Sequence, residues 1–121
     1  MAKSFNRHFQ FLGSSKQVRP SGPLWLPAAD VYATEDGWVV KVELAGVAAE
    51  DVEIEVQGNV LYIAGCRKDK SCAAGVAYHQ MEISYSRFEK SIKFPGPIEG
   101  ASIRRDYRDG FLIIDVRSEQ D

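Results

Sequence analysis

One stretch of the chain contains four residues whose side chains could bind a metal ion or act as nucleophiles: Cys66, Cys72, His79 and Glu82. Zinc sites usually combine two pairs of closely spaced cysteines or histidines. The two cysteines here are spaced more widely, and no second pair completes the set. A cysteine–histidine pair for nucleophilic catalysis also requires an oxyanion donor, and the sequence places none nearby. We therefore expect structural or incidental roles for these residues, with no metal and no cofactor.

Two glutamates, Glu53 and Glu55, share one face of a predicted strand and could imitate an acid–base pair. Carboxylates are routine on the solvent face of a strand, so we expect both side chains to face water. The chain contains no Gly-Lys pair for a phosphate-binding loop and no Gly-x-Ser-x-Gly turn for a serine nucleophile. The sequence therefore predicts that the protein is not an enzyme, and a thiol or hydrolytic activity is the least supported alternative.

Charge is distributed unevenly along the 121 residues, whose formal net charge is −2. Residues 1–29 contain Lys3, Arg7, Lys16 and Arg19 but no acid, so they carry +4 and the remainder carries −6. Four dispersed cations make a weak patch for nucleic acid, and a solubilising arm fits them better. No run is apolar enough to span a bilayer, and residues 1–15 lack the apolar core of a secretory signal. We expect a cytoplasmic protein with no nucleic-acid partner and no integral membrane segment.

The elements that must position any functional side chain are strands. Short runs alternate apolar and polar residues, which places successive side chains on opposite faces. Gly58-Asn59 and Asp109-Gly110 are signals for tight hairpin turns. Several short strands with turns between them indicate an all-β antiparallel sandwich. The predicted strands cover residues 30–33, 38–44, 52–57, 60–64, 88–94, 101–107 and 111–116, and the alternation also resumes at residues 78–85.

Outside these strands the pattern predicts an arm, a loop and a short tail. Residues 1–26 form a flexible arm, in which Phe5, Phe9 and Leu12 share one face of a short helix. Residues 27–117 form the sandwich domain, and residues 118–121 are a short tail. Residues 67–79 lose the alternation, and an unpatterned stretch of this length in a small domain is usually functional or disordered.

Six segments in order resemble the α-crystallin domain of the small heat-shock protein family, over about residues 27–116. An immunoglobulin-like β-sandwich is the fold that this resemblance implies. Ala45 stands where the family usually has proline. The segments are Pro27-Ala-Ala-Asp-Val-Tyr32, Val40-Lys-Val-Glu-Leu-Ala-Gly-Val47, Gly58-Asn-Val-Leu-Tyr-Ile-Ala-Gly65, Tyr78-His-Gln-Met-Glu82, Phe88-Glu-Lys-Ser-Ile-Lys-Phe-Pro95 and Asp109-Gly-Phe-Leu-Ile-Ile114.

The resemblance implies an ATP-independent holdase, which binds partly unfolded proteins through exposed apolar surface and suppresses their aggregation. It also implies that residues 67–85 form a protruding loop with a strand at about residues 76–80. That strand would pair with the edge at residues 30–33 of a neighbouring subunit in a homodimer. The implied interface residues are Val31, Tyr32, Tyr78, His79, Met81, Glu82 and Lys90.

Three departures from the family pattern change these expectations. The tail Arg117-Ser-Glu-Gln-Asp121 lacks an Ile-x-Ile motif, so we expect dimers or small oligomers. Arg105 stands where the family has a small residue. We expect it at the rim of a groove between residues 52–56 and 101–107, with its head reaching water or a carboxylate. Lys90 replaces a favoured arginine and loses its bidentate geometry, which puts dimer cohesion there in doubt.

Client contact is expected on the arm and in the groove. Disorder of the arm is an equal alternative, and Ile54 and Val56 are also typical of ordinary sandwich core. A rival interpretation is a sandwich-type co-chaperone that docks on a folded chaperone, although such a protein would usually lack the long loop. The expected client-binding residues are Phe5, Phe9, Phe11, Leu12, Ile54, Val56, Ile103 and Arg105.

Overall fold

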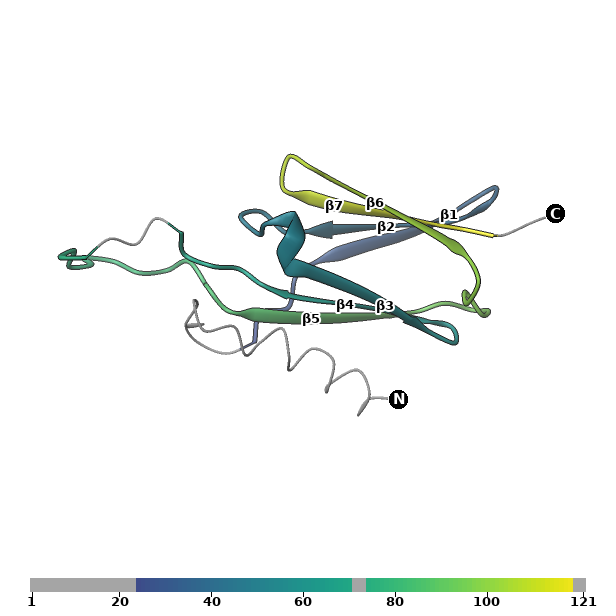
Figure 1. The fold of residues 1–121 in the computed structure, drawn as a ribbon, viewed down its shortest axis with the longest axis horizontal. Helices are drawn as coiled ribbons and strands as arrows, with labels where there is room; N and C mark the ends of the chain where they lie inside the picture. Colours follow the sequence, from purple (N-terminus) through teal and green to yellow (C-terminus); the bar gives the residue numbers. More distant parts are fainter. Residues whose placement is uncertain (1–23, 71–73, 119–121) are drawn as a thin grey trace.

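The computed structural model describes residues 24–70 and 74–118, and these residues form a β-sandwich of two antiparallel sheets (Figure 1). One sheet has the strand order β1-β2-β7-β6 and the other β3-β4-β5. The sandwich predicted from the alternation is confirmed. Its strands are β1 Ala29–Thr34, β2 Gly37–Glu43, β3 Val52–Gln57, β4 Val60–Cys66, β5 Arg87–Lys93, β6 Ser102–Arg108 and β7 Phe111–Arg117, with a 3-10 turn, η1, at Ala49–Asp51.

Two tight hairpins fix the register of four of these strands. Gln57 pairs with Val60 across Gly58 and Asn59, and Arg108 pairs with Phe111 across Asp109 and Gly110. Gly58 has φ of 63°, and Asp109 and Gly110 have φ of 56° and 85°. Positive φ at these positions matches the twist of the flanking strands, and glycine, asparagine and aspartate tolerate it best. Both predicted turns are confirmed.

The core lies between the two sheets. Val40 and Val42 of β2 face Leu61 and Ile63 of β4 in one apolar cluster, and all four side chains are fully buried. Phe88 of β5 belongs to the same cluster and is also fully buried. Full burial of each such side chain contributes about 1.5–3 kcal/mol, so this cluster carries the stability of the fold.

Strand β4 departs from the sequence expectation. Alternation was expected over residues 60–64, but every residue from Leu61 to Cys66 is buried. Successive residues of a strand point to opposite faces of its sheet, so this burial means that both faces of β4 are covered, and a continuous apolar run is typical of such a strand. The run Val60-Leu-Tyr-Ile-Ala64 carries that signal, and the period-of-two interpretation of it is wrong.

The segment between β4 and β5 projects beyond the sandwich (Figure 1). Its described residues 74–86 contain no strand, so the strand expected at residues 76–80 does not form within a single chain. A strand needs a pairing partner, and the expected partner belongs to another subunit. Strand β1 pairs only with β2 among the described residues, which leaves its other edge open. Subunit pairing stays a prediction.

Trp25 already packs on the sandwich, ahead of the expected boundary at Pro27. Its backbone N–H donates to the carbonyl of Arg87 at 2.8 Å, and its ring meets Phe88 edge-on with centroids 5.5 Å apart. The guanidinium of Arg67 lies 3.9 Å from the centre of the Trp25 ring. The chain therefore joins the sandwich alongside β5. Phe5, Phe9, Phe11, Leu12 and Cys72 lie outside the described residues.

Candidate functional site

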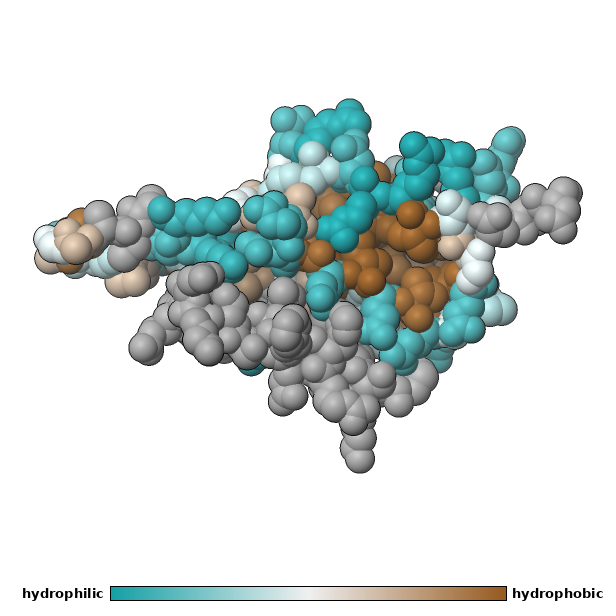
Figure 2. Space-filling view, in the orientation of Figure 1, coloured by the Kyte–Doolittle hydropathy of each residue, from teal (hydrophilic) through white to brown (hydrophobic). Residues whose placement is uncertain are grey.

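The open side of the sandwich between β3 and β6 exposes part of the apolar core, at the place where the sequence predicts a groove (Figure 2). These two strands are edges of different sheets, so no strand closes the space between them. Ile54 and Val56 of β3 and Ile103 of β6 are half-buried and pack on the core. Figure 2 shows apolar surface gathered between these strands and bordered by polar residues. Exposed apolar surface with a polar rim is typical of an interaction site.

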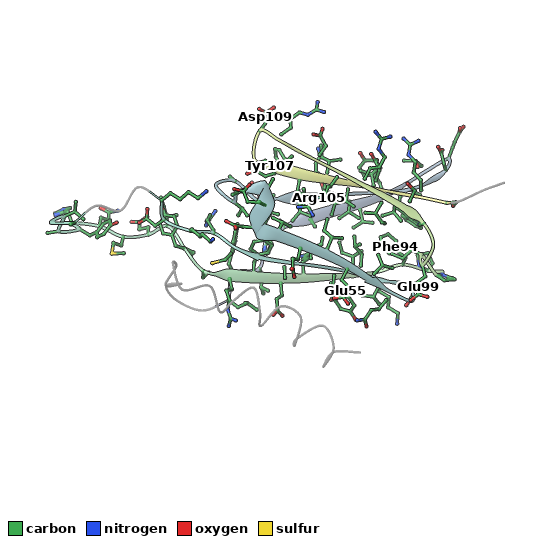
Figure 3. All side chains as sticks on the ribbon, viewed as in Figure 1. Glu55, Phe94, Glu99, Arg105, Tyr107 and Asp109 are labelled. Carbon is green, nitrogen blue, oxygen red and sulfur yellow. The ribbon has the colours of Figure 1, made fainter. Side chains whose placement is uncertain are left out.

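Arg105 closes one end of this groove. The groove separates its strand, β6, from the start of β3 (Figure 3). Its guanidinium donates to the backbone carbonyl of Ala49 at 2.9 Å and to that of Val52 at 3.1 Å. Arg105 is exposed, as expected for a residue at the rim, but the acceptors of its guanidinium are main-chain oxygens and not the expected carboxylate. These bonds join β6 to the entry of β3 across the gap between the sheets.

Replacing Arg105 with alanine should lower the free energy of unfolding by about 1–2 kcal/mol, because two bonds from a charged donor are lost at a partly exposed site. Arg104→Ala is the matched control, since Arg104 is an exposed neighbour on the same strand. Urea denaturation of both variants measures the difference. Equal midpoints for the two variants would show that the Arg105 bridge contributes nothing to stability.

The opposite end of the groove is closed by contacts between the β3–β4 turn and the segment that leads into β6. The backbone N–H of Gly58 donates to Oε2 of Glu99 at 2.8 Å. The side-chain amide of Asn59 donates to the carbonyl of Phe94 at 2.9 Å. Glu99 and Phe94 both lie at this end in Figure 3. Hydrogen bonds therefore hold the groove at both of its ends. Glu99 was not predicted from the sequence, because a single exposed carboxylate carries no pattern.

A further bond holds β6 in place beside Arg105. The hydroxyl of Tyr107 donates to the carbonyl of Leu44 at 2.7 Å, although the two residues are far apart in the sequence. Buried tyrosines usually satisfy their hydroxyl in this way. Tyr107 thereby fixes the β6–β7 hairpin over the end of β2.

Those residues considered for chemistry that the structure describes do not assemble a reactive centre. Cys66 is a free, buried thiol, and burial raises its pKa, which disfavours the reactive thiolate. His79 and Glu82 lie exposed on the projecting segment. In the described part of the chain, no three histidine, cysteine, aspartate or glutamate side chains gather as a metal site would require.

Glu53 and Glu55 lie on the outward face of β3, but the structure corrects the expectation that they simply face water. Both are half-buried, and Oε1 of each is enclosed. Gln57 donates to Oε2 of Glu55 at 3.3 Å.

Apart from Lys90, the expected dimer residues occupy exposed positions on two separate parts of the chain. Val31 and Tyr32 lie on the open-edged strand β1, and 40% and 50% of their surfaces are exposed. Tyr78 and Met81 lie on the projecting segment, exposed by 51% and 62%. There the hydroxyl of Tyr78 donates to Asp69 at 3.1 Å.

The projecting segment also borders an open hollow of about 380 Å³, which is lined by residues that include Tyr78, Met81 and Glu82. Lys90 lies on β5, the edge strand that follows this segment. It is half-buried and pairs in register with the core residue Ile63. Lys90 therefore points to the same face of its sheet as the core, on an edge strand of that sheet.

Comparisons with known proteins assign this sandwich to a known family. The model of the Hsp20/alpha crystallin family matches residues 30–121, which is most of the chain. The chain belongs to this family. Small heat shock protein C2 of Rickettsia felis is 28% identical over 116 residues, covering 96% of this chain and 73% of the relative. The 22.7 kDa class IV heat shock protein of Pisum sativum is 31% identical over 96 residues, covering 78% of this chain and 49% of the relative.

Solved structures of small heat shock proteins share the fold. Heat shock protein 16.0 from Schizosaccharomyces pombe superposes with a TM-score of 0.69 and 24% identity, covering 80% of this chain and 94% of that one. Membership of the Hsp20/alpha crystallin family assigns a chaperone role without ATP rather than an enzymatic one. No helix in the described residues has the length and apolarity to span a bilayer.

Proposed function

We propose that this small heat shock protein is an ATP-independent holdase that binds partly unfolded proteins and suppresses their aggregation. The groove between β3 and β6 carries the proposal, because it presents Ile54, Val56 and Ile103 on an open side of the sandwich with both ends tied. Unfolding chains expose apolar segments and strand edges, and a fixed apolar groove can shield both. Arg105 lies at one end of the groove. We expect it to favour client segments that place a carbonyl or carboxylate oxygen against its exposed guanidinium.

The proposal includes the cytoplasm as the location and the arm residues Phe5, Phe9, Phe11 and Leu12 as a second contact for clients. It also includes a homodimer in which the projecting segment supplies a strand to β1 of the partner. The open edge of β1 and the exposed apolar side chains of residues 76–83 support that pairing, because unpaired strand edges and exposed apolar residues both seek partners. A co-chaperone of the sandwich type would not need this segment.

The general test is an aggregation assay with a thermally unfolding model client, without ATP. We expect the protein in equimolar amount to reduce light scattering severalfold. An unchanged rate of client precipitation in the presence of excess protein would contradict the proposal. A monomer that protects clients only when a second chaperone is added would favour the co-chaperone instead.

Ile54→Ser tests the groove itself. We expect this variant to need severalfold more protein for the same client protection, because a hydroxyl replaces apolar contact area in the groove. Ile113→Ser is the matched control, since Ile113 is also half-buried but lies on the outward face of β7. Both variants lose similar buried area, so their stabilities should fall alike. Equal protection by the two variants would assign Ile54 to the core alone.

A further inference from the structure

The outward face of the three-stranded sheet carries a second apolar cluster, separate from the core. Tyr62 and Ala64 of β4 are only 8% and 1% exposed, and Val60 packs against them. They alternate with Leu61 and Ile63, which belong to the core, so they point away from the sandwich interior.

None of the described elements covers this cluster. The other sheet packs on the opposite face, and no described strand or helix lies over the outer side of β3, β4 and β5 (Figure 1). The residues that pair with Tyr62 in register are Glu55 and Ser91. Flanking side chains of this size cannot enclose the upper surface of a tyrosine ring. The burial of Tyr62 and Ala64 therefore calls for a covering segment.

The surroundings of the cluster are acidic. Glu53 and Glu89 stand on either side of Ala64, and Glu55 stands beside Tyr62. Oε1 of Glu55 is buried and accepts no hydrogen bond from a described residue. The two bases of this face, Arg87 and Lys93, lie at opposite ends of β5. A buried carboxylate oxygen without a donor is costly, so the covering segment should bring cations as well as apolar side chains.

The first 23 residues of this chain supply that combination. Phe5, Phe9 and Leu12 have the spacing of one helical face, and the cations Lys3, Arg7, Lys16 and Arg19 occur there without any acid. The sequence then enters the described structure beside this same sheet, where Trp25 bonds to the backbone of Arg87 on β5.

The arm is long enough to reach the cluster from that entry point. A three-stranded sheet is about 15 Å wide at the usual strand spacing. A helix rises about 1.5 Å per residue and an extended chain about 3.3 Å. Either conformation lets residues 1–23 cross the face and place Phe5 to Leu12 above Tyr62.

We propose that the outward face of β3, β4 and β5 docks the chain's own N-terminal segment, residues 1–23. The apolar residues of the segment cover Tyr62 and Ala64, and its basic residues neutralise the surrounding glutamates. The docking is intramolecular, and it uses Phe5, Phe9 and Leu12, which the holdase proposal offers to clients, so the docked and client-bound states of these residues exclude each other.

Thiol labelling of the full chain tests this docking. In a Cys66→Ser and Cys72→Ser background, Ala64→Cys places a reporter thiol under the covering segment, and Arg104→Cys places a control thiol at an exposed position of the other sheet. We expect the thiol at position 64 to react with a disulfide reagent at least about tenfold more slowly than the one at position 104. Substituting Phe5, Phe9 and Leu12 by serine should raise the rate at position 64 about tenfold and leave position 104 unchanged.

Three results would overturn the proposal. Fast labelling at position 64 with the native arm would show that nothing covers the face, and a slow rate that ignores the arm substitutions would assign the cover to another segment. A slow rate that rises on dilution would assign it to a second copy of the chain. If the cysteine substitutions impair folding, native Cys66, also on this face and 6% exposed, serves as the reporter in a Cys72→Ser chain.

Discussion

Replacing Gly65 with alanine is expected to lower the free energy of unfolding by about 3 kcal/mol, and the Tm by on the order of 10 °C or more. A Cβ at this position would lie 2.4 Å from the carbonyl oxygen of Asp51 and 2.7 Å from the ring of Phe88. Neither group can move away cheaply, because the first is main chain and the second is fully buried in the core. The methyl group therefore forces a shift of β4 against its neighbours.

Gly96→Ala is the control for Gly65, because a Cβ there meets no atom within 4 Å and the backbone needs no positive φ. Thermal and urea unfolding of both variants give the two free energies. A second comparison isolates the cause: Phe88→Leu should cost less in the Gly65→Ala chain than in the native chain, because the smaller side chain relieves part of the clash. A Gly65→Ala protein within about 0.5 kcal/mol of the native stability would refute the steric argument.

Gly65 also illustrates which parts of the structure could be predicted from the sequence. The segment that ends in this glycine was identified by its resemblance to a family pattern, and the structure supplies the physical reason for the glycine. Strands and hairpins were predictable because alternation and turn residues are local signals. The register followed from the two tight turns, since the length of a hairpin loop fixes which residues pair.

The contacts that shape the groove could not be predicted, because their partners carry no sequence signature. Arg105 binds the carbonyls of Ala49 and Val52, and any residue type supplies a carbonyl. The same holds for Tyr107, which binds the carbonyl of Leu44. These contacts depend on how the two sheets meet, which is a property of the tertiary fold.

The predictions for the burial of β4 and for the position of Trp25 failed for a different reason. The apolar run from Val60 to Ala64 was a readable signal of burial on both faces, but the stronger alternation of the other strands dominated its interpretation. Trp25 was assigned to the arm because proline follows closely. Its packing against Phe88 and Arg67 depends on residues distant in the sequence.

The second large effect is expected from the projecting segment. Replacing Val76, Tyr78, Met81 and Ile83 by serine should convert the proposed homodimer to a monomer. These side chains are 51–62% exposed in the single chain, so each can bury further area only against another molecule. A large apolar side chain contributes about 1.5–3 kcal/mol when it is fully buried. Even partial burial of four such side chains amounts to a loss of at least about 100-fold in dimer affinity.

Sedimentation velocity over a range of concentrations measures this change, and circular dichroism establishes that the sandwich remains folded. Phe111→Ser is the control, because Phe111 is 38% exposed on the outward face of β7 and lies under the ammonium group of Lys41, away from both proposed dimer surfaces. An unchanged sedimentation coefficient in the fourfold variant would contradict the role of the segment.

Tyr32→Asp should give the same dissociation from the other side of the proposed contact, because a charge on an open strand edge disfavours pairing with a second chain. The two variants act on separate parts of the molecule, β1 and the segment before β5. If strand exchange holds the dimer together, either change alone is sufficient and combining them adds little, since both remove one shared interface. Additive effects would instead indicate two independent interfaces.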